Sequence, residues 1–241
     1  MGASPRPWIV TPHRPIAVHE ENLWSVESAV PGFPAGTGMD RRMTIVRLGD
    51  GRLVFHNAVP LDEEALARVR AWGKPAILVV PMHLHALDAP AFADKLGLLA
   101  FTSAVTRERV AAMMPIAGAL ADLPLDDSVH CEPLAGTKFG EAAYVVKSGA
   151  RTSLLFCDAI QNSRPGRGVN GFMFKLMGFT GDELKAPPFY KVRAVSDKAA
   201  LKRDLLRLAD TPSLTRLIPS HGLVVDRDPA AALRTAVSRY Y

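Results

Sequence analysis

The sequence predicts a mixed α/β fold in which sheets are covered by helices. A strand–turn–strand pattern stands near residue 50, and short apolar strands then alternate with amphipathic helices. A run of strands without helices follows, and the chain ends in helix, strand and helix. This order is typical of layered α/β structures. With 241 residues, of which 48% are hydrophobic and 22% charged, the chain is long enough to bury a substantial core.

Turn and cap signals locate the individual elements. A Gly-Asp-Gly turn separates two β-forming stretches, 44–48 and 53–55, which indicates a hairpin. Asp62 is a candidate N-cap for the first helix, and Gly73 ends it. Further strands are expected at 76–80, 98–101, 129–132, 142–147, 152–156 and 216–218. Further helices are expected at 90–96, 107–114, 172–177, 197–209 and from 229 onward.

Two regions have no regular pattern. Residues 1–42 are rich in Pro and Gly and predict an irregular N-terminal segment, and residues 161–190 predict a long irregular excursion with one helix. The apolar residues of that excursion favour core or loop packing, with a pocket wall or lid as the alternative. They are Phe172, Phe174, Leu176, Met177 and Phe179. Because no linker or repeat divides the chain, residues 1–241 are expected to form one domain.

Charge and cysteine content limit the classes of partner. The formal net charge of +5 suits an anionic ligand, but the basic residues are dispersed and no basic–aromatic module is present, so nucleic acid is not the expected partner. Only two cysteines occur, which fits a reducing compartment. No stretch reaches the ~18 apolar residues of a membrane span. The first residues lack the apolar core of a secretory signal, so we expect a cytoplasmic protein with no membrane partner. Nothing in the pattern indicates an oligomeric state.

Three apolar strands are each followed by side chains that can bind a metal. His83 and His85 follow one strand. Asp158 follows a second strand and His221 a third. In an extended chain the two histidines point to the same side. Each residue alone has an ordinary explanation, such as a turn or a cap. Together, imidazoles and carboxylates at strand ends are a typical ligand set for Zn²⁺ or Fe.

The arrangement resembles the metallo-β-lactamase fold, from about residue 44 to about residue 224. That family has a His-x-His-x-Asp-His loop after a strand, a Gly-His-x-x-Gly stretch, an Asp ending one strand and a His ending another. His83 and His85 match the first two loop positions, Asp158 matches the strand-end Asp, and His221 matches the last His. The resemblance implies a four-layer αββα sandwich and a metal-dependent hydrolase.

The motif is incomplete in this chain. Leu87 stands at the position of the loop Asp, and Asp88 at that of the third loop His. In the stretch 136–140, Thr137 replaces the imidazole. Three neutral imidazoles and two carboxylates carry a charge of −2, which one divalent ion balances, and Lys138 would repel a second ion. The resemblance therefore implies at most one ion, and the loss of the loop Asp argues against fast hydrolysis.

Two hypotheses remain open at this point. In the first, the protein is a hydrolase of a small molecule with one Zn²⁺ or Fe ion, held by His83, His85 and Asp158 or by Asp88, Asp158 and His221. Asp88 and His221 are also the catalytic candidates, as general base and proton carrier. In the second, no ion is bound, no reaction is catalysed, and the site holds a small anionic ligand. Nucleic-acid processing is a third hypothesis, which rests on net charge alone.

Overall fold

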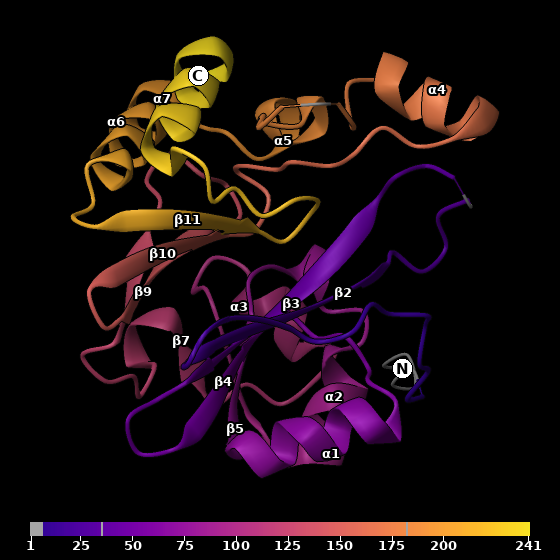
Figure 1. Cartoon of the computed structure of the whole chain (residues 1–241), viewed down its shortest axis with the longest axis vertical. Helices are drawn as coiled ribbons and strands as arrows, with labels where there is room; N and C mark the ends of the chain where they lie inside the picture. The colour runs from indigo at the N-terminus through magenta and orange to yellow at the C-terminus, as the bar shows by residue number, and fades with distance from the viewer. Residues whose placement is uncertain (1–6, 35, 182) are drawn as a thin grey trace. The chain divides into compact units, whose positions relative to one another are not determined.

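Two β-sheets run through the chain, which a computed structural model describes at residues 7–34, 36–181 and 183–241. The strands of the seven-stranded sheet follow chain order from β1 to β7, and the four-stranded sheet has the order β11-β10-β9-β8. Of the described residues, those in 7–28 and 42–131 form a first compact unit, and those in 29–41 and 132–241 form a second (Figure 1).

The seven-stranded sheet combines antiparallel and parallel pairs. Its strands are β1 (Ala17–Glu20), β2 (Leu23–Ala29), β3 (Asp40–Arg47), β4 (Arg52–His56), β5 (Lys74–Val80), β6 (Leu99–Thr102) and β7 (Gly118–Ala119). The antiparallel pair of β3 and β4 confirms the predicted hairpin. From β4 to β7 each neighbouring pair is parallel. Parallel strands end at a common edge, so the histidine-containing segment begins at that edge of the sheet.

The N-terminal segment is more regular than its composition predicts. The expectation of an irregular segment over 1–42 is wrong for β1 and β2, which pair antiparallel, and β3 begins at Asp40. The Pro and Gly residues that dominate the composition lie largely outside these strands. Short strands between them, such as Leu23-Trp24-Ser25-Val26, are buried and gain their stability from tertiary packing.

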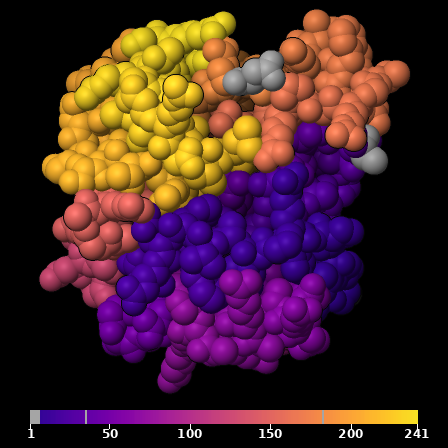
Figure 2. Space-filling view, in the orientation of Figure 1, coloured from indigo at the N-terminus to yellow at the C-terminus, as the bar shows by residue number. Residues whose placement is uncertain are grey.

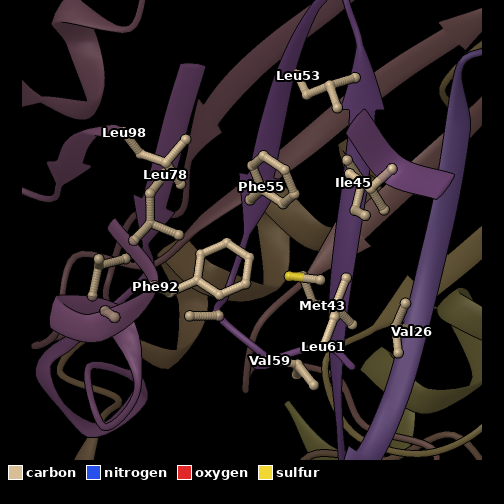
Figure 3. Packing of buried hydrophobic residues seen from close by; sticks show 14 of the residues in the cluster. Val26, Met43, Ile45, Leu53, Phe55, Val59, Leu61, Leu78, Phe92 and Leu98 are labelled. Atoms are coloured by element: carbon tan, nitrogen blue, oxygen red, sulfur yellow. The ribbon is translucent and has the colours of Figure 1, made fainter. Parts of the chain in front are cut away.

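The helices of the first unit contribute apolar side chains to its core. They are α1 (Glu63–Trp72), α2 (Ala89–Leu96) and α3 (Arg107–Ala111), with short 3₁₀ turns η1 (His83–His85) and η2 (Leu120–Asp122). As predicted, the Asp62 side chain accepts the backbone N–H of Ala65 and caps α1. Phe55 of β4 meets Phe92 of α2 edge to face, with ring centroids 5.3 Å apart (Figure 3). Burial of such a ring contributes roughly 2–3 kcal/mol.

The four-stranded sheet determines where two candidate ligands lie. Its strands are β8 (Val129–Pro133), β9 (Ala142–Ser148), β10 (Arg151–Phe156) and β11 (Leu214–Pro219). Strands β10 and β11 are parallel, and Phe156 lies opposite Pro219. Asp158 and His221 each come two residues after this matched pair, so both leave the sheet at the same edge.

The helices of the second unit are α4 (Gly168–Leu176), α5 (Pro188–Arg193), α6 (Lys198–Ala209) and α7 (Pro229–Tyr240). Helix α6 is capped by the Asp197 side chain, which accepts the Ala200 N–H, and buries the predicted apolar face. The excursion over 161–190 holds two helices, where one was predicted. Helix α5 has only six residues and starts at a proline. It is too short to show the apolar spacing by which a helix is predicted from sequence. Among the described residues, no helix has both the length and the apolar character needed to cross a lipid bilayer.

Candidate functional site

Asp158 and His221 form a close pair in the second unit. His221 Nε2 lies 3.3 Å from Asp158 Oδ1, and both side chains are largely buried, with 10% and 14% of their surface exposed. The amide of Gln161 donates a hydrogen bond of 3.0 Å to the same Oδ1 atom. The structure thus brings together two of the residues that the sequence selected at separate strand ends.

The backbone of Asp40 fixes the orientation of His221. Its carbonyl oxygen lies 2.7 Å from His221 Nδ1. A carbonyl can only accept, so Nδ1 carries a hydrogen and, in the neutral imidazole, the lone pair is on Nε2. That lone pair faces the Asp158 carboxylate. Two acceptors at this distance require a cation near both, either a proton or a metal ion.

The distance between the two atoms is compatible with a metal ion between them. A protonated imidazole bound to a carboxylate has a typical N···O distance of about 2.7–2.9 Å. Two ligand atoms, each about 2.1 Å from a tetrahedral Zn²⁺, are about 3.4 Å apart. The observed 3.3 Å between His221 Nε2 and Asp158 Oδ1 matches the second case. The donor set, one imidazole nitrogen and one carboxylate oxygen, is also the one that Zn²⁺ and Fe accept.

Glu141 holds the backbone around Asp158 in place. Its Oε1 accepts the backbone N–H groups of Cys157, Asp158 and Ala159 at 3.1, 2.9 and 2.9 Å. Burial and, to a smaller extent, the Asp158 charge raise the pKa of Glu141 to about 7, against the lowering effect of the backbone N–H donors. Sequence reasoning missed this residue. The available signal was a carboxylate placed directly before an apolar strand, where a carboxylate is rarely buried without partners.

Cys157 is a buried thiol. Burial raises its pKa, and the carboxylates of Asp158 and Glu141 raise it further, which opposes ionisation of the thiol. Neither Cys157 nor Cys131 forms a disulfide. This agrees with the interpretation of Cys157 as a small buried residue at the end of an apolar strand.

In the first unit, His83 and His85 lie in the η1 turn. The prediction that both point to one side of an extended chain is wrong, because residues two apart in a 3₁₀ turn are separated by two thirds of a revolution. The turn forms because the chain leaves β5 through Pro81 and closes with a hydrogen bond from the His85 N–H to the Met82 carbonyl. The side chains of His83 and His85 therefore do not follow the alternation of a β-strand.

Arg109 of α3, which the sequence did not single out, contacts His83. Its Nη1 lies 3.4 Å from His83 Nε2, and a guanidinium only donates, so Nε2 accepts. Burial lowers the pKa of His83, and the Arg109 charge lowers it further. His83 is therefore neutral near pH 7, with its Nε2 lone pair directed at a cation of the protein itself.

His85 and Asp88 complete the first-unit candidates. Asp88 is buried at the start of α2, three residues after His85. His85 lies near His56, a fully buried histidine whose pKa falls to about 3 through burial and, to a smaller extent, through the His85 charge. Leu87, at the position of the missing loop Asp, is exposed.

Thr137 has a structural role at the position where the motif has an imidazole. Its hydroxyl donates to the Leu134 carbonyl at 3.0 Å and accepts the backbone N–H of Glu141 at 3.2 Å. The turn before β9 is thereby fixed, and with it Glu141. Lys138 is exposed.

Comparison with known proteins identifies the fold. The sequence matches no protein-family model, and no curated protein matches it in sequence. The structure is similar to the metallo-β-lactamase DIM-1, with a TM-score of 0.65 and 12% identity over 96% of this chain and 99% of that chain.

Two further metallo-β-lactamase structures show the same likeness. The protein from Pontibacter korlensis gives a TM-score of 0.61 and 14% identity, covering 92% of this chain and 98% of its own. The protein from Hirschia baltica gives a TM-score of 0.59 and 14% identity, covering 93% of this chain and 98% of its own. These likenesses confirm the predicted α/β fold, and the low identity agrees with the departures from the metal-binding motif.

Proposed function

We propose that this chain, which has the metallo-β-lactamase fold, binds one divalent transition-metal ion and hydrolyses a small-molecule substrate. The observation that carries the proposal is the position of His221 Nε2, 3.3 Å from Asp158 Oδ1, while the Asp40 carbonyl holds the Nδ1 hydrogen. The spacing and the chemistry of these two donors fit Zn²⁺ or Fe.

Asp158 and His221 are the proposed ligands from the second unit. The sequence motif also includes His83, His85 and Asp88, which lie in the first unit. Within that unit Arg109 donates to His83 Nε2, and its positive charge opposes the binding of a metal ion by His83. When bound, a divalent ion supplies Lewis acidity, which lowers the pKa of a water molecule and polarises a carbonyl or phosphoryl oxygen.

The residues of the chain supply orientation and proton transfer. Glu141 fixes the Asp158 backbone, and the Asp40 carbonyl fixes His221. In this proposal Asp88 accepts a proton as general base. Leu87 cannot accept a proton, so we expect slow turnover compared with a chain that carries Asp there.

A cytoplasmic location is part of the same proposal. Both cysteines are thiols, and a reducing compartment maintains thiols.

A second candidate function is metal-free binding of a small anionic ligand. Arg109 favours it, because an exposed guanidinium beside a neutral imidazole is a common way to bind a carboxylate or phosphate. In that case a proton, rather than a metal ion, lies between His221 and Asp158.

Elemental analysis of protein purified without a histidine tag distinguishes the metal-dependent hydrolase from the metal-free binding protein. We expect about one equivalent of zinc or iron in the wild type, and less than about a tenth in the double variant Asp158→Asn/His221→Ala. The chain contains a matched control in the first unit. His13 Nε2 also lies 3.3 Å from a carboxylate oxygen of Asp62, but it accepts the Asp62 backbone N–H, so His13→Ala should retain the metal.

A wild-type protein that contains no transition metal, and takes up none when Zn²⁺ is added, would contradict the hydrolase proposal. Hydrolysis is then measured on lactam, lactone, thioester and phosphodiester substrates with the metal-loaded protein. Activity that survives the double variant would also contradict it.

A further inference from the structure

Helix α4 presents an apolar stripe to solvent. Val169, Phe172, Met173 and Leu176 recur at the spacing i, i+3, i+4 and i+7, and they are 79%, 66%, 44% and 71% exposed. Met177, directly after the helix, is 50% exposed. This spacing normally marks the face of a helix that packs on a core. Here it lies on the molecular surface, within the orange segment of Figure 2.

The opposite side of α4 is occupied, so the helix cannot rotate to bury the stripe. The Phe174 ring contacts Phe33 and Phe179, with centroid distances of 5.8 and 5.6 Å. Gly171 is buried against Gly166, and a Cβ there would lie 2.1 Å from the Gly166 carbonyl carbon. The orientation of α4 is therefore fixed by ring contacts and by a close backbone approach.

Positive charge borders the stripe. Arg164, Arg167 and Lys175 are exposed, and the stretch 159–181 contains no Asp or Glu. Asp182 lies outside the described residues, and Glu183 is paired with Arg239. The surface around α4 thus combines long apolar side chains with cations, in a chain whose formal net charge is +5.

We propose that α4 docks the protein on an anionic lipid surface. Apolar side chains of an interfacial helix enter the boundary between headgroups and acyl chains, and bordering Lys and Arg bind lipid phosphates. A second copy of the chain fits this surface less well, since a two-fold contact brings the same cations face to face. The expectation of no membrane partner is revised here. It concerned membrane-spanning segments, whereas this contact is peripheral.

Vesicle flotation tests the proposal. We expect the wild type to float with vesicles of phosphatidylcholine and phosphatidylserine, and not with phosphatidylcholine alone. Phe172→Ser/Leu176→Ser should weaken binding by about tenfold or more, since most of the inserted apolar surface is lost. Arg164→Gln/Arg167→Gln should weaken it by about fivefold for each cation, and added salt should reduce it. Val105→Ser, which changes an apolar residue that is 62% exposed in the first unit, is the matched control and should bind as the wild type does.

Three results would overturn the proposal. They are absence of wild-type binding to the anionic vesicles, equal binding by the Phe172→Ser/Leu176→Ser variant, and equal binding to vesicles without phosphatidylserine. A wild-type dimer in sedimentation that this variant dissociates, without any vesicle binding, would assign the stripe to a second copy instead. Because the substituted side chains are exposed, circular dichroism should show an unchanged fold in every variant.

Discussion

The carbonyl of Asp40 and the nitrogen of His221 are 181 positions apart in the chain, and their hydrogen bond selects the His221 tautomer. Glu141 acts in a comparable way on Asp158, through three backbone N–H groups rather than through the side chain. At the scale of single residues, the ligand atoms of the candidate site are oriented by groups that are not ligands themselves. Such outer partners commonly determine the affinity of a metal site.

Two variants of Glu141 should differ sharply in stability. Glu141→Ala leaves three buried N–H donors without their acceptor, at about 1–3 kcal/mol each, so the free energy of unfolding should fall by about 3 kcal/mol or more. Glu141→Gln keeps an oxygen acceptor and should stay within about 1–2 kcal/mol of the wild type. Denaturant unfolding measures both values. An equal loss of unfolding free energy in the two variants would show that the side-chain oxygen at position 141 does not stabilise the fold by accepting these N–H groups.

His56 should make the protein sensitive to acid. Its pKa is about 3 in the folded chain because of burial, compared with 6.5 in the reference state. Below the unfolded pKa, the unfolded chain takes up a proton that folded His56 does not accept. The free energy of unfolding should therefore decrease as pH falls from about 6.5 towards 3, by up to about 1.4 kcal/mol per pH unit from this residue.

Unfolding curves of the wild type and of His56→Gln over this pH range isolate the contribution of His56. The other titratable groups are the same in both proteins, so their contributions cancel when the two unfolding free energies are subtracted. The stability advantage of the wild type should shrink as the pH falls. His130→Gln, at an exposed position, is the control variant. Parallel curves for the wild type and His56→Gln would show that His56 does not titrate as proposed.

At the scale of elements, α4 is held by one face only. Phe174 provides its ring contacts, whereas Phe172 projects into solvent. Phe174→Ala should open the helix locally and increase amide hydrogen exchange in α4 by about tenfold, which corresponds to roughly 1.4 kcal/mol. Phe172→Ala should leave the exchange rates unchanged. Similar rates in the two variants would mean that the Phe33–Phe174–Phe179 contacts do not stabilise α4.

Local signals made several elements predictable. The Gly-Asp-Gly turn, the caps Asp62 and Asp197 and the apolar face of α6 all depend on neighbouring residues, and each is observed. The strand ends that carry Asp158 and His221 were also found correctly, and parallel pairing of β10 and β11 explains why they meet.

The remaining features depend on tertiary contacts. The η1 turn at His83–His85 replaced an expected extended segment. The roles of Glu141 and Arg109 require knowledge of which distant segments approach them. No periodicity in the sequence encodes such contacts, so the pattern indicated Asp158 and His221 as candidate ligands but not the groups that orient them.

At the scale of the whole molecule, the order of strands and helices predicted a mixed α/β fold. The His and Asp residues at strand ends carried the resemblance to the metallo-β-lactamase fold, which the solved structures confirm at 12–14% identity. The fold does not determine whether a metal is bound, because the motif lacks the loop Asp and one imidazole. The number of ions therefore depends on the few residues that remain.

Metal binding should stabilise the folded chain. If Zn²⁺ binds the native state only, a concentration a hundred times the dissociation constant adds about 2.7 kcal/mol to the free energy of unfolding. We expect thermal unfolding of the wild type to shift upward with Zn²⁺ and back with a chelator. The Asp158→Asn/His221→Ala variant should show no shift. An equal shift in both proteins would place the zinc elsewhere.

Anomalous diffraction at the zinc edge, from crystals of the zinc-loaded protein, is the most direct measurement. We predict one strong peak within bonding distance of both His221 Nε2 and Asp158 Oδ1, with the His221 Nδ1 contact to the Asp40 carbonyl unchanged. A density map without a peak there, in which the imidazole and the carboxylate are joined by a short hydrogen bond, would contradict a metal-binding function.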